Sequence, residues 1–441
     1  MIFPQYNALW KAIIRPSRDT YEDHELGPSR FRIRGVPVYR EDIELTNPRG
    51  QHLKCSWFHP NWKFDNNDDD DDDDQEVCCP CVIYLHGNCS SRLEGLQAIP
   101  VLLPLGISLF VFDFAGSGKS DGEYVSLGYY EKDDLAAVVE YLRRSELAST
   151  IGLWGRSMGA VTALLHGDRD PSIAGMVIDS AFQDMRTLAT DLAQQLGFRI
   201  PGLMLSAVLG MLRLSVKSRA HFDIFDLEPI AHVSIFRLTM KDTNKVKSRP
   251  FLFQVDQTYI PALFTAARGD TFINSRNTDA LFEKYAGDKN LVKVDGNHNT
   301  TRPKFLMHSI AIFFVNTLGC ETTVDAVLDL NDLSPPAEQE DATEDQNDSR
   351  TSTDPSDSAE ANNSPPRAGD LSNGLSMPSP PRERIQFDSD RLIEAAVPLS
   401  CFEEDRMVEE ALEQSMEESL VDDKERRNED MPPIRKEKSA L

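Results

Sequence analysis

The sequence alternates between apolar runs of strand length and amphipathic runs of helix length over most of residues 81–318. Cys81–Leu85 and Ile107–Phe112 are continuous apolar runs, which is typical of strands that are buried on both faces. A run with helical periodicity follows them at Tyr130–Leu142. Strands that alternate with helices in this way need crossover connections, so the sequence predicts an α/β fold. We expect a mostly parallel, eight-stranded sheet with helices on both faces, opened by antiparallel strands of which the first is Phe31–Tyr39.

The alternation also divides the chain into segments. Residues 1–30 precede it as an N-terminal extension, and residues 31–319 form the predicted α/β domain. Within this domain, residues 182–260 stand where one helix would suffice, which predicts a helical insertion that serves as a lid. Residues 65–76 contain eight Asp and one Glu, and such a run predicts a solvated acidic loop. Residues 320–441 are rich in Asp, Glu, Ser and Pro, which predicts a disordered acidic tail.

The charge and cysteine content exclude several classes of protein. Of the net charge of −26, residues 321–441 carry −20 and residues 65–76 carry −9, so the remainder carries +3. A body this close to neutral lacks the basic surface of a nucleic-acid-binding protein. Seven cysteines, and no visible secretory signal in Met1–Trp10, predict reduced thiols and a cytoplasmic location. The longest apolar stretch, Leu203–Leu214, is about half of what a membrane-spanning helix requires, so no transmembrane segment is expected.

The strongest local signal is the pentapeptide Gly155–Gly159, which places Ser157 between two glycines. It directly follows the predicted strand Ile151–Trp154 and precedes the predicted helix Ala160–Leu165. A sharp turn from strand to helix exposes a serine hydroxyl at the carboxyl edge of a sheet, and the glycines remove Cβ atoms that would clash in this turn. The sequence therefore predicts Ser157 as a catalytic nucleophile.

A serine hydroxyl needs a base, and the base needs an acid that orients it. Asp270 follows the predicted strand Ala262–Ala266, and His298 follows the predicted strand Leu291–Val294, so both lie at carboxyl ends of strands. The chain order Ser, Asp, His is the order of the strand-turn-helix serine hydrolases. Asp179, after another strand, is an alternative acid, and we favour Asp270.

Acyl transfer also requires N–H donors for the developing oxyanion. The backbone N–H of Met158, immediately after the nucleophile, is one candidate. The second should come from the loop that follows the strand Cys81–Leu85, where we predict the N–H of Asn88, with Cys89 as the alternative. His86, in the same loop, is interpreted as a residue that shapes the loop rather than as the base.

Two other motifs are interpreted as structural. Gly116–Ser120 ends like a phosphate-binding loop, but that motif needs a glycine at position 113, where this chain has Asp. Cys78–Cys81 has no second ligand pair with zinc-site spacing and is interpreted as the start of a buried strand. We therefore expect no metal and no cofactor.

Together these motifs resemble the serine-aminopeptidase-like hydrolases of the α/β-hydrolase superfamily, over about residues 10–318. The opening segment Ile14–Tyr21 resembles a cytosolic branch of that group found in plants and protists. The sequence departs from the family in three places: Ala181 replaces a proline, the acidic loop is inserted, and Val246–Tyr259 lengthens the insertion. None of these departures involves a residue of the candidate triad. The resemblance is carried by six segments: His86–Asn88, Asp113–Ser120, Gly155–Gly159, Asp179–Phe182, Gly269–Asp270 and Gly296–Asn299.

The resemblance implies the α/β-hydrolase fold and a serine hydrolase that cleaves an ester, thioester or amide of a small acyl or peptide substrate through an acyl-enzyme. In the tail, residues 403–419 resemble a ubiquitin-interacting motif, which implies ubiquitin or ubiquitinated proteins as partners. An apolar face at steps of three and four residues carries this second resemblance: Val408, Ala411, Leu412 and Ser415. The alternative function is a ubiquitin-binding adaptor whose hydrolase domain is a catalytically weak scaffold.

Overall fold

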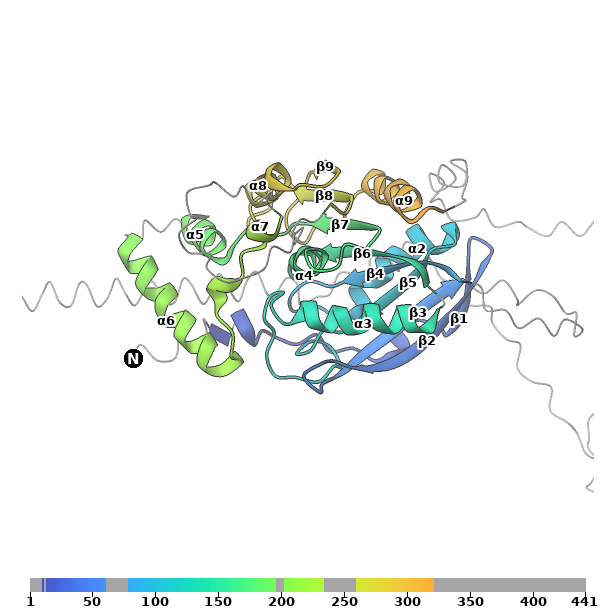
Figure 1. Cartoon of the computed structure of the whole chain (residues 1–441), viewed down its shortest axis with the longest axis horizontal. Coiled ribbons are helices and arrows are strands. Elements are labelled where there is room, and N and C mark those ends of the chain that lie inside the picture. The colour runs from blue at the N-terminus through green and yellow to red at the C-terminus, as the bar shows by residue number, and fades with distance from the viewer. Residues whose placement is uncertain are drawn as a thin grey trace, which may run out of the picture. The chain divides into compact units, whose positions relative to one another are not determined.

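The computed structural model describes residues 10, 11, 13–60, 78–146, 148–195, 202–233 and 259–320. These residues form a nine-stranded sheet in the order β1-β2-β3-β5-β4-β6-β7-β8-β9 (Figure 1). The six strands from β5 to β9 in this order are parallel to one another, whereas β1, β2 and β3 are antiparallel. The strands are β1 Arg30–Ile33, β2 Val36–Thr46, β3 His52–Pro60, β4 Cys79–Leu85, β5 Ser108–Phe112, β6 Ala148–Arg156, β7 Gly175–Asp179, β8 Ala262–Ala267 and β9 Lys289–Val294.

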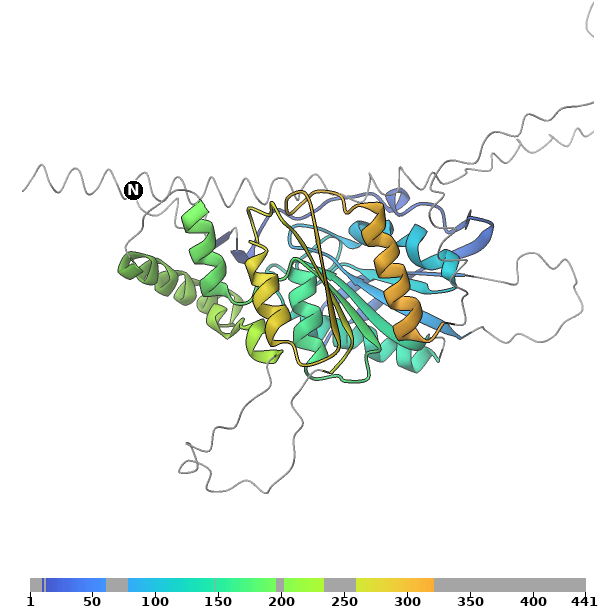
Figure 2. The same cartoon turned by 90° about the horizontal axis from the view of Figure 1, so that it is seen from above.

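Helices cover both faces of the sheet, as predicted. The elements α3, α4 and α8 pack on one face, and η3, α2 and α9 pack on the other, where Figure 2 shows α9 (orange) lying over the sheet. The helices are η1 Asp23–Leu26, η3 Arg92–Ala98, α2 Ile99–Leu102, η4 Leu103–Leu105, α3 Glu131–Ser145, α4 Met158–Gly167, α5 Met185–Gln195, α6 Gly202–Ala220, η5 Ile224–Asp226, α7 Pro229–His232, α8 Arg276–Lys284 and α9 Lys304–Leu318.

The central strand β4 shows why the buried strands read as continuous apolar runs. Cys81 and Ile83 point into the core beneath α3 and α4, whereas Val82 and Tyr84 point into the core beneath α2 and α9. Because side chains alternate between the faces of a strand, a strand covered on both faces has no solvent-facing position that would require a polar residue. The prediction of a parallel sheet covered on both faces is confirmed.

The first antiparallel strand was misplaced by the sequence pattern, and the sheet has nine strands rather than eight. The chain turns at Arg34 and Gly35, both of which have positive φ (49° and 82°), and Ile33 pairs with Val36 across this turn. A two-residue turn with positive φ at both positions joins adjacent antiparallel strands. The expected single strand Phe31–Tyr39 is therefore a hairpin, with β1 on one side and the start of β2 on the other.

The described part of residues 1–30 packs closely on the domain. Trp10 and Ile14 are buried in the core beneath α3 and α4, although the pattern suggested no more than an extension. Arg18 donates to the carbonyls of Ser120 (3.0 Å) and Gly122 (2.6 Å), in the loop after β5. This segment therefore holds a loop at the carboxyl edge of the sheet.

The same segment also reaches the loop that follows β4. The Ser91 hydroxyl donates to Asp19 (2.6 Å), and the Tyr21 hydroxyl accepts from the guanidinium of Arg92 (2.6 Å) and donates to the Asp113 carboxylate (2.7 Å). Burial raises the pKa of the Tyr21 phenol, and the Asp113 carboxylate raises it further. Tyr21 is therefore a neutral donor at every physiological pH.

Several predicted segments lie outside the described residues. They are the acidic loop 65–76, two parts of the insertion (196–201 and 234–258), and residues 321–441 with the ubiquitin-motif-like stretch 403–419. Within the part of the chain that the structure describes, no helix combines the length and the apolar character needed to cross a membrane.

Candidate active site

Ser157 lies in a sharp turn between β6 and α4. Its backbone has φ 52° and ψ −117°, a conformation that L-residues rarely adopt and that costs on the order of 1–3 kcal/mol. The flanking glycines permit the turn: a Cβ on Gly155 would lie 2.3 Å from the Gly159 carbonyl oxygen, and a Cβ on Gly159 would lie 1.9 Å from the Leu85 carbonyl oxygen. The Ser157 N–H donates to the Asp179 carbonyl at 2.8 Å, which ties the turn to the neighbouring strand β7.

His298 and Asp270 meet at the same edge of the sheet. Asp270 follows β8 and His298 follows β9, and these two strands are adjacent and parallel. The Asp270 Oδ2 lies 2.7 Å from the His298 Nδ1, and both residues are buried. With Nδ1–H donating to the carboxylate, the lone pair of the imidazole lies on Nε2, which is the arrangement of a catalytic base.

Backbone N–H groups fix the Asp270 carboxylate. Its Oδ1 accepts from the N–H of Phe272 (2.9 Å) and the N–H of Ile273 (2.7 Å), which leaves Oδ2 for the imidazole. The Phe272 ring also lies against the imidazole, with 5.2 Å between ring centroids. The sequence pattern did not reveal Phe272, because nothing distinguishes it from other loop aromatics.

Asp179, the alternative acid, is engaged elsewhere. The Arg302 guanidinium donates to both of its carboxylate oxygens, from Nε at 2.8 Å and from Nη2 at 3.0 Å. Burial by itself would raise the pKa of Asp179, but the charge and hydrogen bonds of Arg302, together with the charge of Arg156, hold this pKa below its usual range. The geometry therefore favours Asp270 over Asp179 as the partner of the imidazole.

The loop after β4 passes beside Ser157. A Cβ placed on Gly87 would lie 3.8 Å from the Ser157 Cβ. In the same loop, the His86 Nε2 accepts from the Phe114 N–H (3.1 Å), so its Nδ1 carries the proton and donates to the Gly87 carbonyl (2.7 Å). His86 thus shapes this loop, as the sequence suggests. Asn88, the next residue, is buried.

The N–H of Met158 lies in the first turn of α4, which begins directly after Ser157. The first N–H groups of a helix have no intrahelical acceptor, and the helix dipole gives this end a partial positive charge. This helix end therefore supplies an N–H donor next to the candidate nucleophile.

Two buried charged residues at the site were not foreseen. Glu94 is fully buried in η3 and accepts from the Gly87 N–H (2.8 Å) and the Arg156 Nη1 (3.2 Å). Arg156 also donates from Nη2 to the His298 carbonyl (2.8 Å) and to the Asn299 Oδ1 (2.9 Å). The one available signal was the position of Arg156, a charged residue at the end of a buried apolar strand.

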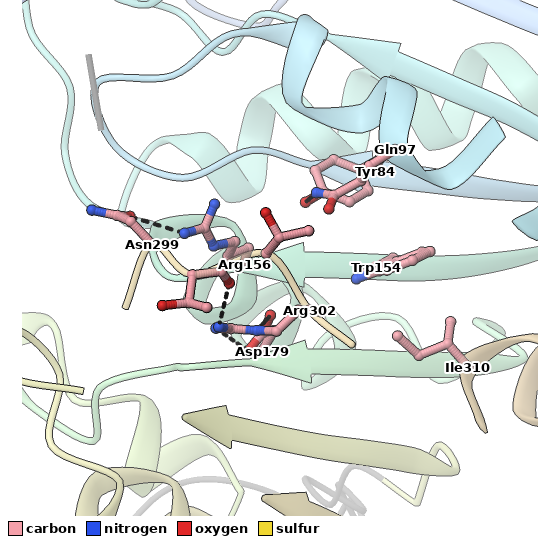
Figure 3. Close-up of a pocket in the computed structure, with 10 residues that line it drawn as sticks. Tyr84, Gln97, Trp154, Arg156, Asp179, Asn299, Arg302 and Ile310 are labelled. Carbon is pink, nitrogen blue, oxygen red and sulfur yellow. Dashed lines mark hydrogen bonds and ion pairs between the residues drawn. The ribbon is translucent and has the colours of Figure 1, made fainter. Parts of the chain in front are cut away.

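A small cavity is lined in part by Arg156 and Arg302 (Figure 3). Its volume is about 10 Å³, which is room for about one water molecule and not for a substrate. The residues around it are Tyr84, Gln97, Trp154, Arg156, Asp179, Asn299, Thr300, Thr301, Arg302 and Ile310.

The loop Gly116–Ser120 is closed around a carboxylate of the protein itself. The Lys119 N–H donates to the Asp113 Oδ2 (2.9 Å), and the Ser120 hydroxyl donates to the Asp113 carbonyl (2.6 Å). The Lys119 ammonium pairs with Asp23 at 2.6 Å. This geometry agrees with the interpretation that the loop is no phosphate site.

The cysteines of the Cys78–Cys81 stretch enter a strand, as predicted. Cys79 and Cys81 are buried in β4, and burial raises the pKa of the Cys81 thiol to about 12. Among the residues that the structure describes, no three His, Cys, Asp or Glu side chains are grouped so that they could hold a metal ion.

Comparison with known proteins finds similarity to a family over residues 79–298. The model of the family described as "Serine aminopeptidase, S33" matches residues 79–298. Over 219 residues the chain is 29% identical to an uncharacterised protein, YqkD, of Bacillus subtilis, which covers 49% of this chain and 64% of YqkD. Over 169 residues it is 27% identical to an uncharacterised protein, YfhR, of Escherichia coli K12, which covers 37% of this chain and 54% of YfhR. The chain thus spans less than two thirds of each of these relatives.

Among solved structures, the chain is similar to an esterase from Pyrococcus furiosus, with a TM-score of 0.48 and 21% identity, over 70% of this chain and 99% of that chain. The predicted fold class is confirmed by the nine-stranded, mostly parallel sheet. Residues 79–298, about half of the chain, are thus similar to the serine aminopeptidase S33 family, and they include the parallel part of this sheet.

Proposed function

We propose that the protein is a serine hydrolase that cleaves an acyl bond, in an ester, a thioester or an amide, through an acyl-enzyme. The observation that carries this proposal is the 2.7 Å contact between Asp270 and His298 at the sheet edge that also holds the strained Ser157. A buried imidazole oriented by a carboxylate is what a serine hydroxyl needs to become a nucleophile.

In the proposed mechanism, the Ser157 hydroxyl attacks the acyl carbon while the His298 Nε2 takes its proton. Asp270 holds the imidazole and stabilises the imidazolium that forms. The N–H groups of Met158 and Asn88 donate to the oxyanion, with Cys89 as the alternative to Asn88. His298 then gives this proton to the leaving group as its bond to the acyl carbon breaks. A water molecule next attacks the acyl carbon while His298 Nε2 takes its proton, and the Ser157 oxygen leaves and takes that proton back, which frees the acid.

The substrate class is a small acyl or peptide compound that reaches the site under residues 182–260. We propose that this segment is a lid within a hydrolase domain of residues 31–319. We also propose that the protein is cytoplasmic. The segment Ile14–Tyr21 resembles the plant and protist branch, and we propose that the protein belongs to it. The name of the matched family does not by itself select amides over esters, because enzymes that share a fold differ in substrate.

A serine-directed fluorophosphonate probe tests the proposal. We expect the wild-type protein to be labelled covalently and Ser157→Ala to remain unlabelled, because the probe reacts only with an activated serine. Ser309→Ala is a matched control: this hydroxyl lies on α9 and donates to the Phe305 carbonyl, so its removal should leave labelling unchanged. A folded wild-type protein that never reacts with the probe would favour the scaffold alternative, an adaptor with little turnover.

We also propose that residues 403–419 bind ubiquitin or ubiquitinated proteins. The support is the spacing of Ala411 and Ser415, whose small side chains would let one helical face lie flat on an apolar surface. We expect the full chain to bind immobilised ubiquitin, and the double variant Ala411→Gln, Ser415→Glu to lose that binding. Ala342→Gln, elsewhere in the tail, is the control. Equal retention of the double variant and the wild type would contradict the proposal.

A further inference from the structure

We propose that Arg156 is a positioning residue that fixes the loop carrying His298 and couples it, through Glu94, to the oxyanion loop after β4. This inference rests on the proposed function, because it assigns Arg156 a role in the geometry of that reaction. Arg156 directly precedes the candidate nucleophile, so one side chain would connect three parts of the site.

The first half of the connection is to the backbone of the base. Arg156 donates from Nη2 to the His298 carbonyl (2.8 Å) and to the Asn299 side chain (2.9 Å), and Figure 3 shows Arg156 directed toward Asn299. A hydrogen bond from a charged donor is stronger than one between neutral groups. Arg156 thus binds the backbone carbonyl of His298, the proposed base.

A second arginine supports the same loop. Arg302 donates to the carbonyls of Thr300 (3.0 Å) and Asn297 (3.3 Å), and its Nη2 lies 3.5 Å from the His298 carbonyl. Arg302 is in turn held by Asp179 in a bidentate ion pair. Two arginine side chains therefore hold the loop between β9 and α9.

The second half of the connection is to the oxyanion loop. The Glu94 Oε1 accepts from Arg156 Nη1 (3.2 Å), while the Glu94 Oε2 accepts from the Gly87 N–H (2.8 Å). Gly87 immediately precedes Asn88, the proposed oxyanion donor. A displacement of Arg156 would therefore be transmitted to both loops, although they lie about 200 residues apart in the chain.

The charges around Arg156 argue against a ligand-binding role. Glu94 balances Arg156, and Asp179 balances Arg302, so the group holds two positive and two negative charges. The adjoining cavity of about 10 Å³ has room for about one water molecule. The contacts of Arg156 can instead hold the backbone of the loops that carry His298 and Asn88. Such positioning matters because a displacement of about 1 Å in an active site can lower the rate about 100-fold.

The test compares Arg156→Met with the wild type. We expect kcat on an activated ester to fall about 100-fold with little change in KM, and fluorophosphonate labelling to slow by a similar factor. Arg156→Lys should recover part of the loss, because it keeps the charge but not the fork of donors. Millimolar ethylguanidinium should partly restore activity to Arg156→Ala, a rescue that a purely structural role would not produce.

Glu94 provides a second variant that separates positioning from stability. Arg156→Met leaves the charged Glu94 buried without its cation, which destabilises the fold. The double variant Glu94→Gln, Arg156→Met removes that unpaired charge, so we expect it to be more stable than Arg156→Met alone. We expect it to lose no more activity than the worse single variant, because the two side chains act as one unit. A folded double variant with wild-type kcat would overturn the proposal.

Arg49→Met is the matched control. Arg49 lies in the turn between β2 and β3, and pairs with the fully buried Asp134 at 2.8 Å, so its loss also breaks an ion pair with a buried carboxylate. We expect it to lower the melting temperature while kcat of the folded protein stays near wild type. An equal loss of kcat in Arg49→Met and Arg156→Met would show a general effect of stability and contradict the positioning role. A folded wild type that reacts with neither ester nor probe would instead contradict the proposed function.

Discussion

Ser157→Ala is expected to lower kcat on any substrate of the protein by up to about six orders of magnitude, the size of loss that removal of the serine causes in subtilisin. The hydroxyl forms the acyl-enzyme, so without it the remaining rate comes only from the oxyanion donors and from substrate binding. The variant should fold, because the change removes one oxygen and leaves Gly155 and Gly159 in place. Steady-state hydrolysis of an activated ester, with circular dichroism to verify folding, measures the effect.

Combining this change with His298→Ala sharpens the prediction. Because the serine and the base act as one unit, the double variant should be about as slow as the slower single variant and not slower by the product of both losses. Multiplicative losses would mean that the two side chains contribute through separate steps, and the proposed proton transfer between them would be wrong.

Asp270→Asn is expected to lower kcat by about 10⁴, as the equivalent change does in a serine protease of another fold. The amide NH₂ group would donate to the imidazole Nδ1, which would leave the proton on Nε2 and remove the base. Stability should change little, because the Asn oxygen can still accept from the N–H groups of Phe272 and Ile273. Hydrolysis rates and thermal unfolding of the same preparation measure both effects.

Two further aspartates serve as comparisons for Asp270. Asp295 lies on the same loop as His298, is 92% exposed and pairs with Arg268, so Asp295→Asn should keep wild-type activity. Asp179→Asn should instead lower the free energy of unfolding by about 3–5 kcal/mol, because it leaves Arg302 buried without its carboxylate. Its loss of kcat should be smaller than that of Asp270→Asn, and the reverse order would identify Asp179 as the acid.

The sequence located the candidate triad because each of its members follows a strand that the pattern reveals. Ser157 is marked by the two glycines around it, and the structure shows why: both lie where a Cβ would collide with backbone. Asp270 and His298 could be paired because parallel strands end at a common edge. The sequence already favoured Asp270 over Asp179, but the 2.7 Å contact between Asp270 and His298 could be seen only in the structure.

The buried network behind the triad could not be predicted in the same way. Glu94 and Arg156 stand 62 residues apart, and no periodicity relates them, because their pairing results from how η3 packs against the end of β6. The hairpin at Arg34 and Gly35 was missed for a different reason. Apolar residues occur on both sides of the turn, with only Arg34 and Gly35 between Ile33 and Val36, so the run was interpreted as one strand although the alternation changes phase there.

The packing of residues 13–30 on the domain bears on the shortest polypeptide that should fold. The family match begins at residue 79, yet Asp19 and Tyr21 bond to Ser91 and Arg92 of the loop that leads away from Asn88. A protein started at residue 79 would lack β1, β2 and β3 and would leave the buried Arg92 without the phenol that it contacts. The folded unit that carries the candidate triad therefore starts well upstream of the part that matches the family, because Asp19 and Tyr21 bond back onto that part.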